Sequence, residues 1–433
     1  MFAFFENLIK PFPPAEPVRP PDSLFAFCRH YTRGIEPYLV IMSVLTALIA
    51  VMEISLFAFL GRLVDWLSIS DPSTFIDTHR DELVRWAVLI LVLLPTAIAL
   101  HALIVHQTLL GNYPMRIRWQ AHRYLLGQSM SFYQDEFAGR ISTKLMQTSL
   151  AVREAVLKLL DVLLYVTVYF GGLLVMIASA NIKLTIPLFV WLGLYICILS
   201  YFIPKLGRVS MRQADARSDM TGRIVDSYTN ISTVKLFSHS QRESDYAQQG
   251  MGKFLDTVHE QMRLVTALIV SVWSINVVMV FSICALSINL WMSATITTGV
   301  IASSIGPAIR LFGMSQWVMW EFSALFENLG TIQDGINTIS RPKSVQDIEN
   351  AKPLIIKDGE IRYQNVCFHY GKGKGVIDNF SLTIKHGEKV GLVGRSGAGK
   401  STLVNLLLRF HDVESGHILI DNQDISQIAQ ETL

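Results

Sequence analysis

The sequence is poor in charged residues and in cysteine. Charged side chains make up 17% of its 433 residues and the net charge is only +2, whereas ordinary soluble domains carry about 25% charged residues. This balance gives no indication of nucleic-acid binding. The cysteines form no CxxC pair and no Cys/His spacing, so neither a zinc site nor a disulfide framework is predicted. They are Cys28, Cys197, Cys284 and Cys367.

Hydrophobic residues are abundant instead, at 51% of the chain with a mean hydropathy of +0.38. This composition is typical of a membrane protein with a soluble part attached. Six apolar stretches fit transmembrane helices of about 20 residues or more. We predict an all-α transmembrane domain over residues 37–330, with six helices near residues 38–66, 83–110, 156–178, 182–203, 264–291 and 295–326. Several are longer than a bilayer is thick, so they should continue into water as helical stalks.

Residues 1–36 precede the first span and show no basic stretch followed by a long apolar core, so no cleavable signal is predicted. Prolines predict a stiff, extended segment here. Asp22 and Ser23 can then cap a short helix over Leu24–Arg33, which mixes aromatic and basic residues. We interpret it as an interfacial helix on the cytoplasmic face, and a plain linker helix is the alternative. The prolines are Pro11, Pro13, Pro14, Pro17, Pro20 and Pro21.

The distribution of lysine and arginine predicts the orientation of the spans. The first loop between spans is acidic, with Asp65, Asp71 and Asp77. The N-terminal segment and the two long connections are basic, so we place them in the cytoplasm. The chain is therefore predicted to be a multi-pass protein of the plasma (bacterial inner) membrane, with its N-terminus and C-terminal domain cytoplasmic. The basic residues include Arg29, Arg33, Arg116, Arg118, Arg123, Arg140, Lys205, Arg208, Arg212 and Arg217.

The two long cytoplasmic connections have few turn breakers and an apolar/polar pattern of helical period. Structureless loops of 40–60 residues are uncommon in compact proteins, so we expect helices that turn at short tips. The tips fall near residues 131–140 and 227–235. They would link the soluble domain to the membrane, and solvated loops without a partner are the alternative.

Residues Gly394 to Ser401 match the phosphate-binding pattern G-x-x-x-x-G-K-[ST]. The context agrees, because Glu388–Val393 reads as a short buried strand and Ser401–Arg409 as a helix. An ordinary glycine-rich turn would not need both. Backbone N–H groups and the helix N-terminus would surround the phosphates of ATP. Lys400 should reach the β- and γ-phosphates, and Ser401 should ligand Mg²⁺.

Together these features resemble the ATP-binding-cassette (ABC) exporters, in the half-transporter form with a type I membrane domain ahead of the nucleotide-binding domain. The resemblance implies a linker over residues 331–356 and a partial α/β P-loop domain over residues 357–433. It implies that Tyr370, in Val366–Tyr370, stacks on adenine, as an aromatic face suits a purine. Residues 230–237 are similar to a coupling helix, with Asn230, Thr233 and Lys235 in coupling roles. The implied nucleotide-binding residues are Tyr370, Gly394, Arg395, Ser396, Gly397, Ala398, Gly399, Lys400, Ser401 and Thr402.

The chain departs from the family pattern after the phosphate loop. A full cassette has a glutamine loop, a signature motif, a catalytic glutamate and a switch histidine, and none is found up to Leu433. The run Ile418–Asp421 resembles the motif before that glutamate, but Asn422 follows it. We interpret it as a strand that turns at residues 421–424. No catalytic residue is therefore expected within these residues, and two copies of this sequence would not complete the shared ATP sites.

Charged residues within apolar spans are costly, so they are usually functional or paired. Glu53 and Arg310 are candidates for lining a transport cavity or for pairing with each other, unless the helices leave the bilayer there. Asp161 lies near the cytoplasmic end of its span, and we interpret it as structural. His101 and His106 are five residues apart, off one helical face, so no metal site is predicted.

Two functions remain open at this stage. The first is ATP-driven export of an amphipathic, lipid-like or drug-like solute by a dimer of half-transporters, with a second copy of the chain and membrane lipids as partners and with ATP and Mg²⁺ as cofactors. The second is a truncated, non-catalytic membrane protein that binds ATP weakly. Sequence alone names neither the solute nor the choice between homodimer and heterodimer.

Overall fold

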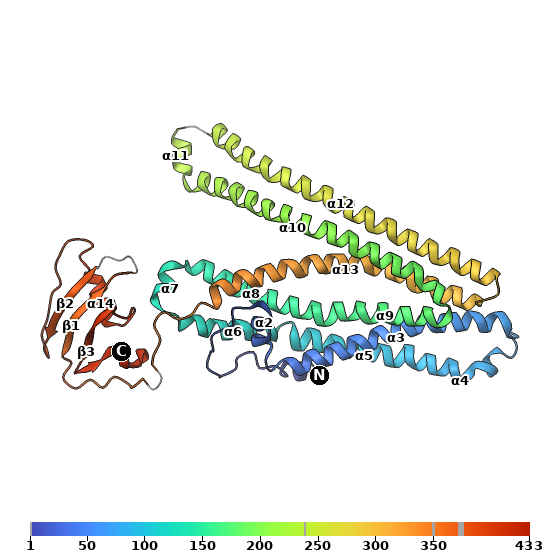
Figure 1. Cartoon of the computed structure of the whole chain (residues 1–433), viewed down its shortest axis with the longest axis horizontal. Coiled ribbons are helices and arrows are strands. Elements are labelled where there is room, and N and C mark those ends of the chain that lie inside the picture. The colour runs from blue at the N-terminus through green and yellow to red at the C-terminus, as the bar shows by residue number, and fades with distance from the viewer. Residues whose placement is uncertain (1, 238–239, 349–350, 371–375) are drawn as a thin grey trace. The chain divides into compact units, whose positions relative to one another are not determined.

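A computed structural model describes residues 2–237, 240–348, 351–370 and 376–433 of the chain (Figure 1). The chain divides into two units, which are described in turn. Unit 1 holds Met1–Leu8, Gly34–Leu110 and Glu154–Asn328. Unit 2 holds Ile9–Arg33, Gly111–Arg153 and Leu329–Leu433. Residues 349–350 of the predicted linker lie outside the described residues.

Helices account for nearly all of the chain before the linker (Figure 1). Most of the predicted spans belong to helices that extend well beyond them, as expected for stalks. The bounds are α1 (Phe2–Glu6), α2 (Leu24–Thr32), α3 (Glu36–Ile69), α4 (Phe75–Val88), η1 (Leu89–Leu93), α5 (Leu94–Ala102), η2 (Leu103–Leu109), α6 (Asn112–Leu126), α7 (Met130–Asp135), α8 (Ala138–Leu157), η3 (Lys158–Leu163), α9 (Leu164–Ala180), η4 (Ile182–Thr185), α10 (Ile186–Thr229), α11 (Ile231–Leu236), α12 (Ser240–Met292) and α13 (Thr298–Ile339). The segments η1, η2 and η3 are π-helical and η4 is a 3₁₀ turn.

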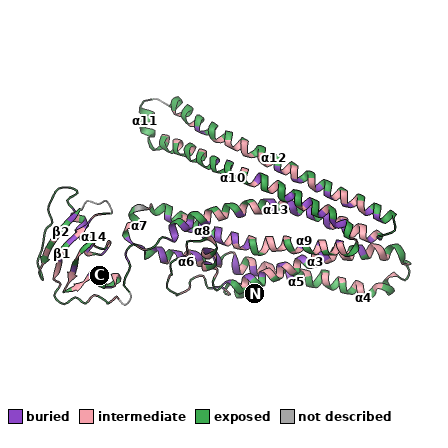
Figure 2. Cartoon of the chain, in the orientation of Figure 1, coloured by how far each residue is buried: buried purple, intermediate pink, exposed green. Residues whose placement is uncertain are grey.

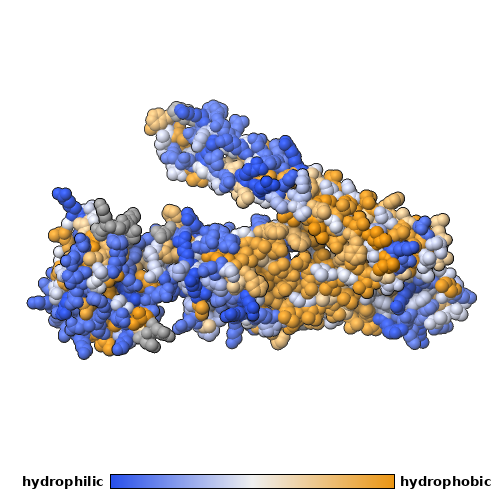
Figure 3. All heavy atoms as spheres, in the orientation of Figure 1, coloured by the Kyte–Doolittle hydropathy of each residue, from blue (hydrophilic) through white to orange (hydrophobic). Residues whose placement is uncertain are grey.

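Within the described residues, five helical segments are long and apolar enough to cross a membrane, with mean hydropathies of 2.1 to 2.7 in their most apolar stretches. They are Glu36–Ile69, Phe75–Leu126, Ala138–Ala180, Ile182–Thr229 and Ser240–Met292. The predicted sixth span lies in α13, where Arg310 and Glu321 lower the hydropathy. Figure 3 shows hydrophobic side chains over the middle of the unit 1 helices and hydrophilic ones near α11.

A stripe of buried residues on α12 contributes to its pairing with α10 as a hairpin. Buried positions on α12 recur three or four residues apart, so they form one stripe along the helix (Figure 2). The stripe holds Leu268, Val272, Asn276, Met279, Ile283, Ser287 and Leu290. Off the stripe, Val277 and Phe281 are exposed. Exposed apolar side chains of this kind suit a lipid environment rather than water.

A buried polar network crosses the core of unit 1. The Trp191 indole donates to Asn276 Oδ1 at 2.7 Å, and Asn276 Nδ2 donates to Ser315 Oγ at 2.7 Å. The Tyr195 hydroxyl donates to the Ser315 carbonyl at 2.9 Å. Each side chain of this network therefore has a partner, as is favourable in an apolar environment. The network joins α10, α12 and α13, so it specifies how these three helices pack.

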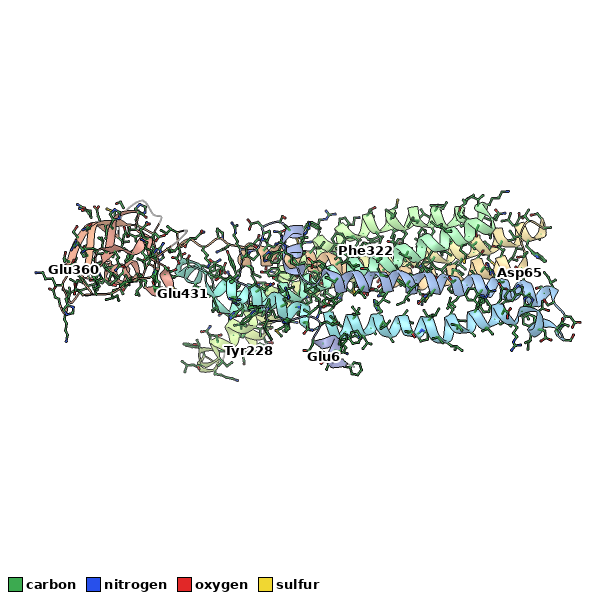
Figure 4. All side chains as sticks on the ribbon, turned by 90° about the horizontal axis from the view of Figure 1, so that it is seen from below. Glu6, Asp65, Tyr228, Phe322, Glu360 and Glu431 are labelled. Atoms are coloured by element: carbon green, nitrogen blue, oxygen red, sulfur yellow. The ribbon has the colours of Figure 1, made fainter. Side chains whose placement is uncertain are left out.

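The carboxylate of Asp65, on α3, caps the N-terminus of helix α13. The carboxylate accepts from the Gly299 amide at 2.7 Å and from the Thr297 hydroxyl at 2.8 Å (Asp65 is labelled in Figure 4). The carboxylate thus satisfies an amide that the first turn of α13 leaves free. The backbones touch here, because a Cβ on Gly299 would lie 2.0 Å from the Gly61 carbonyl oxygen. Only glycine permits this approach.

The N-terminal segment of unit 2 is extended and lies along α6. Carbonyl oxygens of Pro13 and Pro14 accept from Trp119 Nε1 at 3.1 Å and from Arg123 Nη1 at 3.2 Å. Prolines have no N–H, so they give such a segment acceptors without donors. The expected short helix follows as α2, and Ser23 Oγ accepts from the Ala26 amide at its start.

The C-terminal part of unit 2 is a four-stranded antiparallel sheet of order β2-β1-β3-β4 with α14 (Lys400–Leu407) packed on it. The strands are β1 (Ile361–Phe368), β2 (Ile377–Ile384), β3 (Ser415–Ile420) and β4 (Gln423–Asp424), and the 3₁₀ turns are η5 (Ile425–Gln427) and η6 (Gln430–Thr432). Leu403 and Leu406 of the helix meet Tyr363, Val366 and Ile418 in its core. This core holds α14 against the sheet.

The strand predicted over Glu388–Val393 is wrong. The segment is not a strand, and Val393 is 94% exposed. A central strand is stabilised by hydrogen bonds to its neighbours, and no strand of the described sheet pairs with this segment. The predicted turn after β3 does form, because Asp421 and Asn422 take φ values of +47° and +60°.

The contact between α3 and α13 generates a stability prediction. Gly299→Ala should lower the thermal unfolding midpoint, because the new methyl group has no room against Gly61 and Asp65; overpacking of this kind costs about 1–3 kcal/mol. The control is Gly313→Ala on the same helix, where a Cβ meets nothing within 4 Å. It should leave the midpoint unchanged or raise it, since alanine favours helix by about 1 kcal/mol. Equal midpoints for both variants in detergent would contradict the close approach.

Candidate nucleotide-binding site

The phosphate-binding loop runs into the N-terminus of α14. Gly397 and Gly399 take φ values of +84° and +85°, which strain any residue with a Cβ. A Cβ on Gly399 would also lie 2.7 Å from Ile377 Cδ1. The glycines therefore keep open a cradle of backbone beside the helix N-terminus. Such a cradle suits an anion, because the amides and the helix dipole both favour negative charge.

Lys400 points back into this loop. Its Nζ donates to the carbonyl oxygens of Gly394 and Arg395 at 2.8 and 2.9 Å. Ser401 is exposed beside it at the start of α14, and Ala398 donates its amide to the Arg395 carbonyl at 3.1 Å. The predicted residues 394–401 thus form one loop with the Lys400 ammonium group at its centre, and this arrangement fits the phosphates of a nucleoside triphosphate.

Tyr370 lies close to the same helix. Its hydroxyl is 3.3 Å from Thr402 Oγ1, and Tyr370 is 42% exposed. Thr402 itself is 6% exposed. The structure therefore brings the predicted aromatic platform to the phosphate loop, although Tyr370 and Thr402 are 32 residues apart in the sequence.

Glu53 and Arg310 lie together in unit 1. Arg310 Nη2 is 3.3 Å from Glu53 Oε2, and the Tyr165 hydroxyl donates to the same oxygen at 2.5 Å. Of the two charged side chains, Glu53 is 24% exposed and Arg310 51%. The Glu53 carboxylate is thus paired with the Arg310 cation of α13 and accepts a hydrogen bond from Tyr165 of α9.

Two further pairs of ionisable residues lie in unit 1, and neither pairing was predicted from the sequence. Lys158 pairs with Glu321 at the wall of an apolar pocket, which Phe322 and Val162 also line (Phe322 is labelled in Figure 4). His101 Nε2 lies 3.0 Å from Asp161 Oδ1, and Thr46 contacts both. Each pair consists of ionisable groups in or beside an apolar helix, and the need for a partner was the available signal.

The predicted coupling residues lie at the tip of the α10–α12 hairpin. Asn230 joins α10 to α11, and its Nδ2 donates to the Asp226 carbonyl at 3.1 Å. Thr233 and Lys235 are exposed on α11. Their neighbours include large apolar side chains that are strongly exposed: Tyr228 (71%; labelled in Figure 4), Leu236 (78%) and Phe237 (61%).

Asp421 is occupied by the backbone. Its carboxylate accepts from the amides of residues 357–360, which include Gly359 at 3.0 Å and Lys357 at 2.7 Å. These hydrogen bonds, led by that from Gly359, lower the pKa of Asp421 to about 2. Asp421 therefore fixes the loop that ends at Glu360 (labelled in Figure 4), just before β1. With its carboxylate bound to backbone amides, it is not positioned to activate water.

Comparison with known families supports both parts of the chain. The ABC transporter transmembrane region matches residues 39–314, and the ABC transporter domain matches residues 377–433. A Haemophilus influenzae protein described as an uncharacterized ABC transporter ATP-binding protein is 46% identical over all of this chain. A putative multidrug export ATP-binding/permease protein of Staphylococcus aureus is 26% identical over 71% of it.

The rat ATP-binding cassette sub-family B member 6 is 29% identical over 56% of the chain. The chain spans 70% of the length of the Haemophilus protein, 54% of the Staphylococcus protein and 30% of the rat protein. Among solved structures, a bacterial Atm1-family ABC exporter with ATP bound has the same fold, with a TM-score of 0.73 at 19% identity. That match covers 91% of this chain and 70% of the exporter.

The loop geometry generates a binding prediction. Gly399→Ala should weaken ATP binding about tenfold, because a left-handed φ costs an alanine roughly 1–2 kcal/mol and Ile377 fills the space. Gly391→Ala is the matched control, since a Cβ there meets nothing within 4 Å. Titration calorimetry of the protein in lipid nanodiscs measures both affinities. If both variants bind ATP like the parent protein, the cradle does not hold the phosphates.

Proposed function

Because the chain belongs to the ABC transporter family, we propose that it is one half of an ATP-driven exporter for an amphipathic, lipid-like or drug-like solute. One observation carries the proposal: a glycine cradle with Lys400 at its centre follows a set of long apolar helices in the same chain. One polypeptide would then carry both the ATP-binding site and the helices that form the path through the membrane.

The nucleotide would be held by residues from three places. The loop amides and Lys400 would bind the phosphates, and the Ser401 hydroxyl would ligand Mg²⁺. Tyr370 would stack on the base with its exposed face. Bound Mg²⁺ would neutralise charge on the phosphates. The proposed roles of these residues are to bind and orient the nucleotide.

The chemistry of the unit 1 helices supports an amphipathic solute. The pocket at Lys158 and Glu321 has apolar walls with one ion pair, and the pair Glu53–Arg310 gives a second polar point. A solute with an apolar body and a polar or charged group matches such a surface. The name of the Staphylococcus relative refers to multidrug export, which agrees with this class.

A second copy of the chain is the proposed partner. The hairpin tip exposes Tyr228, Leu236 and Phe237, and large exposed apolar clusters are typical of interfaces. In the proposed dimer this tip passes nucleotide-driven motion to the helices through Asn230, Thr233 and Lys235. The basic residues of the connections support the proposal that the ATP site lies on the cytoplasmic side of the plasma membrane.

The test is ATP binding and turnover by the purified protein in lipid. Lys400→Ala should weaken ATP binding at least about tenfold, because it removes the cation of the phosphate loop, and any turnover that the parent protein shows should be lost with it. Lys389→Ala, an exposed lysine just ahead of the loop, should change neither quantity. Binding that is lost without Lys400 but never followed by turnover would favour a nucleotide-binding protein over an exporter. Binding that ignores Lys400→Ala would contradict the proposal altogether.

A further inference from the structure

Three aromatic rings form a cluster beside the phosphate loop. Phe368, at the end of β1, lies 4.8 Å from Tyr370 between ring centroids with an interplanar angle of 79°. His411 lies 5.2 Å from Tyr370 at 86°, and 5.4 Å from Phe368 at 40°. Edge-to-face contacts of this kind are favourable geometries for aromatic pairs. Tyr370 is therefore held by two other rings.

Tyr370 is also fixed at its far end. Its hydroxyl lies 3.3 Å from Thr402 Oγ1, and Thr402 belongs to the first turn of α14. With Phe368 6% exposed and Tyr370 42% exposed, the cluster is buried on one side and open on the other. The open side of Tyr370 is the surface that a purine can cover.

His411 stands on a turn that is itself anchored. Arg409 is 3% exposed and has a φ of +50°, an unfavourable value for a side-chain-bearing residue. Its guanidinium donates to Asp347 Oδ1 at 3.0 Å, to the Ile428 carbonyl at 2.8 Å and to Asp412 Oδ1 at 2.9 Å. Two separate segments, at Asp347 and Ile428, therefore hold the turn that presents His411 to Tyr370, and Asp412 is bound within the turn itself.

We infer that His411 is a positioning residue for base recognition: its ring holds Tyr370 in the orientation that stacks on the adenine of ATP. The inference rests on the proposed nucleotide-binding function and adds to it a residue outside the phosphate-binding pattern. Helix α14 then serves both ends of the nucleotide. Its N-terminus faces the phosphates, and the turn after its C-terminus orients the base platform.

The imidazole suits this role as a neutral aromatic ring. Burial lowers the pKa of His411, which favours the uncharged form of the ring. Its Nε2 is buried and has no hydrogen-bond partner in the part of the chain that the structure describes. The ring thus contributes by packing, and an aromatic replacement should preserve its effect.

The experiment compares two ligands on the protein in lipid nanodiscs. ATP engages both the phosphate loop and the platform, whereas inorganic tripolyphosphate engages the loop alone. His411→Ala should weaken ATP binding about two- to tenfold, the range of an aromatic pair contact, and leave tripolyphosphate affinity unchanged. His411→Tyr should restore ATP affinity, because it returns an aromatic ring. His417→Ala, an exposed histidine on β3, should alter neither ligand.

A second comparison separates positioning from folding. In a Tyr370→Ala background, His411→Ala should have no further effect on ATP, because the platform it supports is gone. Equal weakening of both ligands by His411→Ala, or an unchanged ratio of the two affinities, would overturn the inference. Failure of the proposed function itself is a different result: ATP and tripolyphosphate would then both bind independently of Lys400.

Discussion

The unit 1 helices are governed by the cost of an unsatisfied polar group in an apolar environment. Most of their backbone groups are satisfied within the helices, and several buried polar side chains find partners on neighbouring helices. Asn276 is the clearest example, because it accepts from Trp191 and donates to Ser315 on a third helix. The ion pairs follow the same rule, since Glu53 meets both Arg310 and Tyr165. Partner choice therefore decides which helices pack together, where apolar contact alone would not discriminate.

The same constraint relates the fold to the proposed transport. Charges retained at Lys158–Glu321 and Glu53–Arg310 cost free energy in an apolar surrounding, and their pairing reduces that cost. A solute that carries its own polar group can compete for these partners. An apolar solute gains nothing from them. The paired charges thus give the proposed pathway a chemical preference while leaving the helices stable without a solute.

In the nucleotide-binding part, the short helix α14 sets the positions of the segments on either side of it. Packing of Leu403 and Leu406 against the sheet fixes α14. Because the phosphate loop precedes α14 and the Arg409 turn follows it, the packing of this helix also positions both of them. Asp347 of the linker binds Arg409, so the linker is attached to this helix as well.

Local patterns in the sequence were enough to predict the helical membrane part, the phosphate loop at residues 394–401 and the turn at Asp421. Each depends on neighbouring residues: apolar runs, a glycine-lysine pattern, and side chains that tolerate positive φ. The prediction of a strand at Glu388–Val393 was wrong, because a strand needs a hydrogen-bonding partner elsewhere in the chain and the local pattern does not show whether one is present. The pairs His101–Asp161 and Lys158–Glu321, and the packing of His411 on Tyr370, were likewise invisible. The sequence by itself determined which segments are apolar and which loop carries the phosphate-binding pattern, because both depend on neighbouring residues. Only the tertiary structure decided which distant polar and aromatic groups meet, because those contacts join residues far apart in the chain.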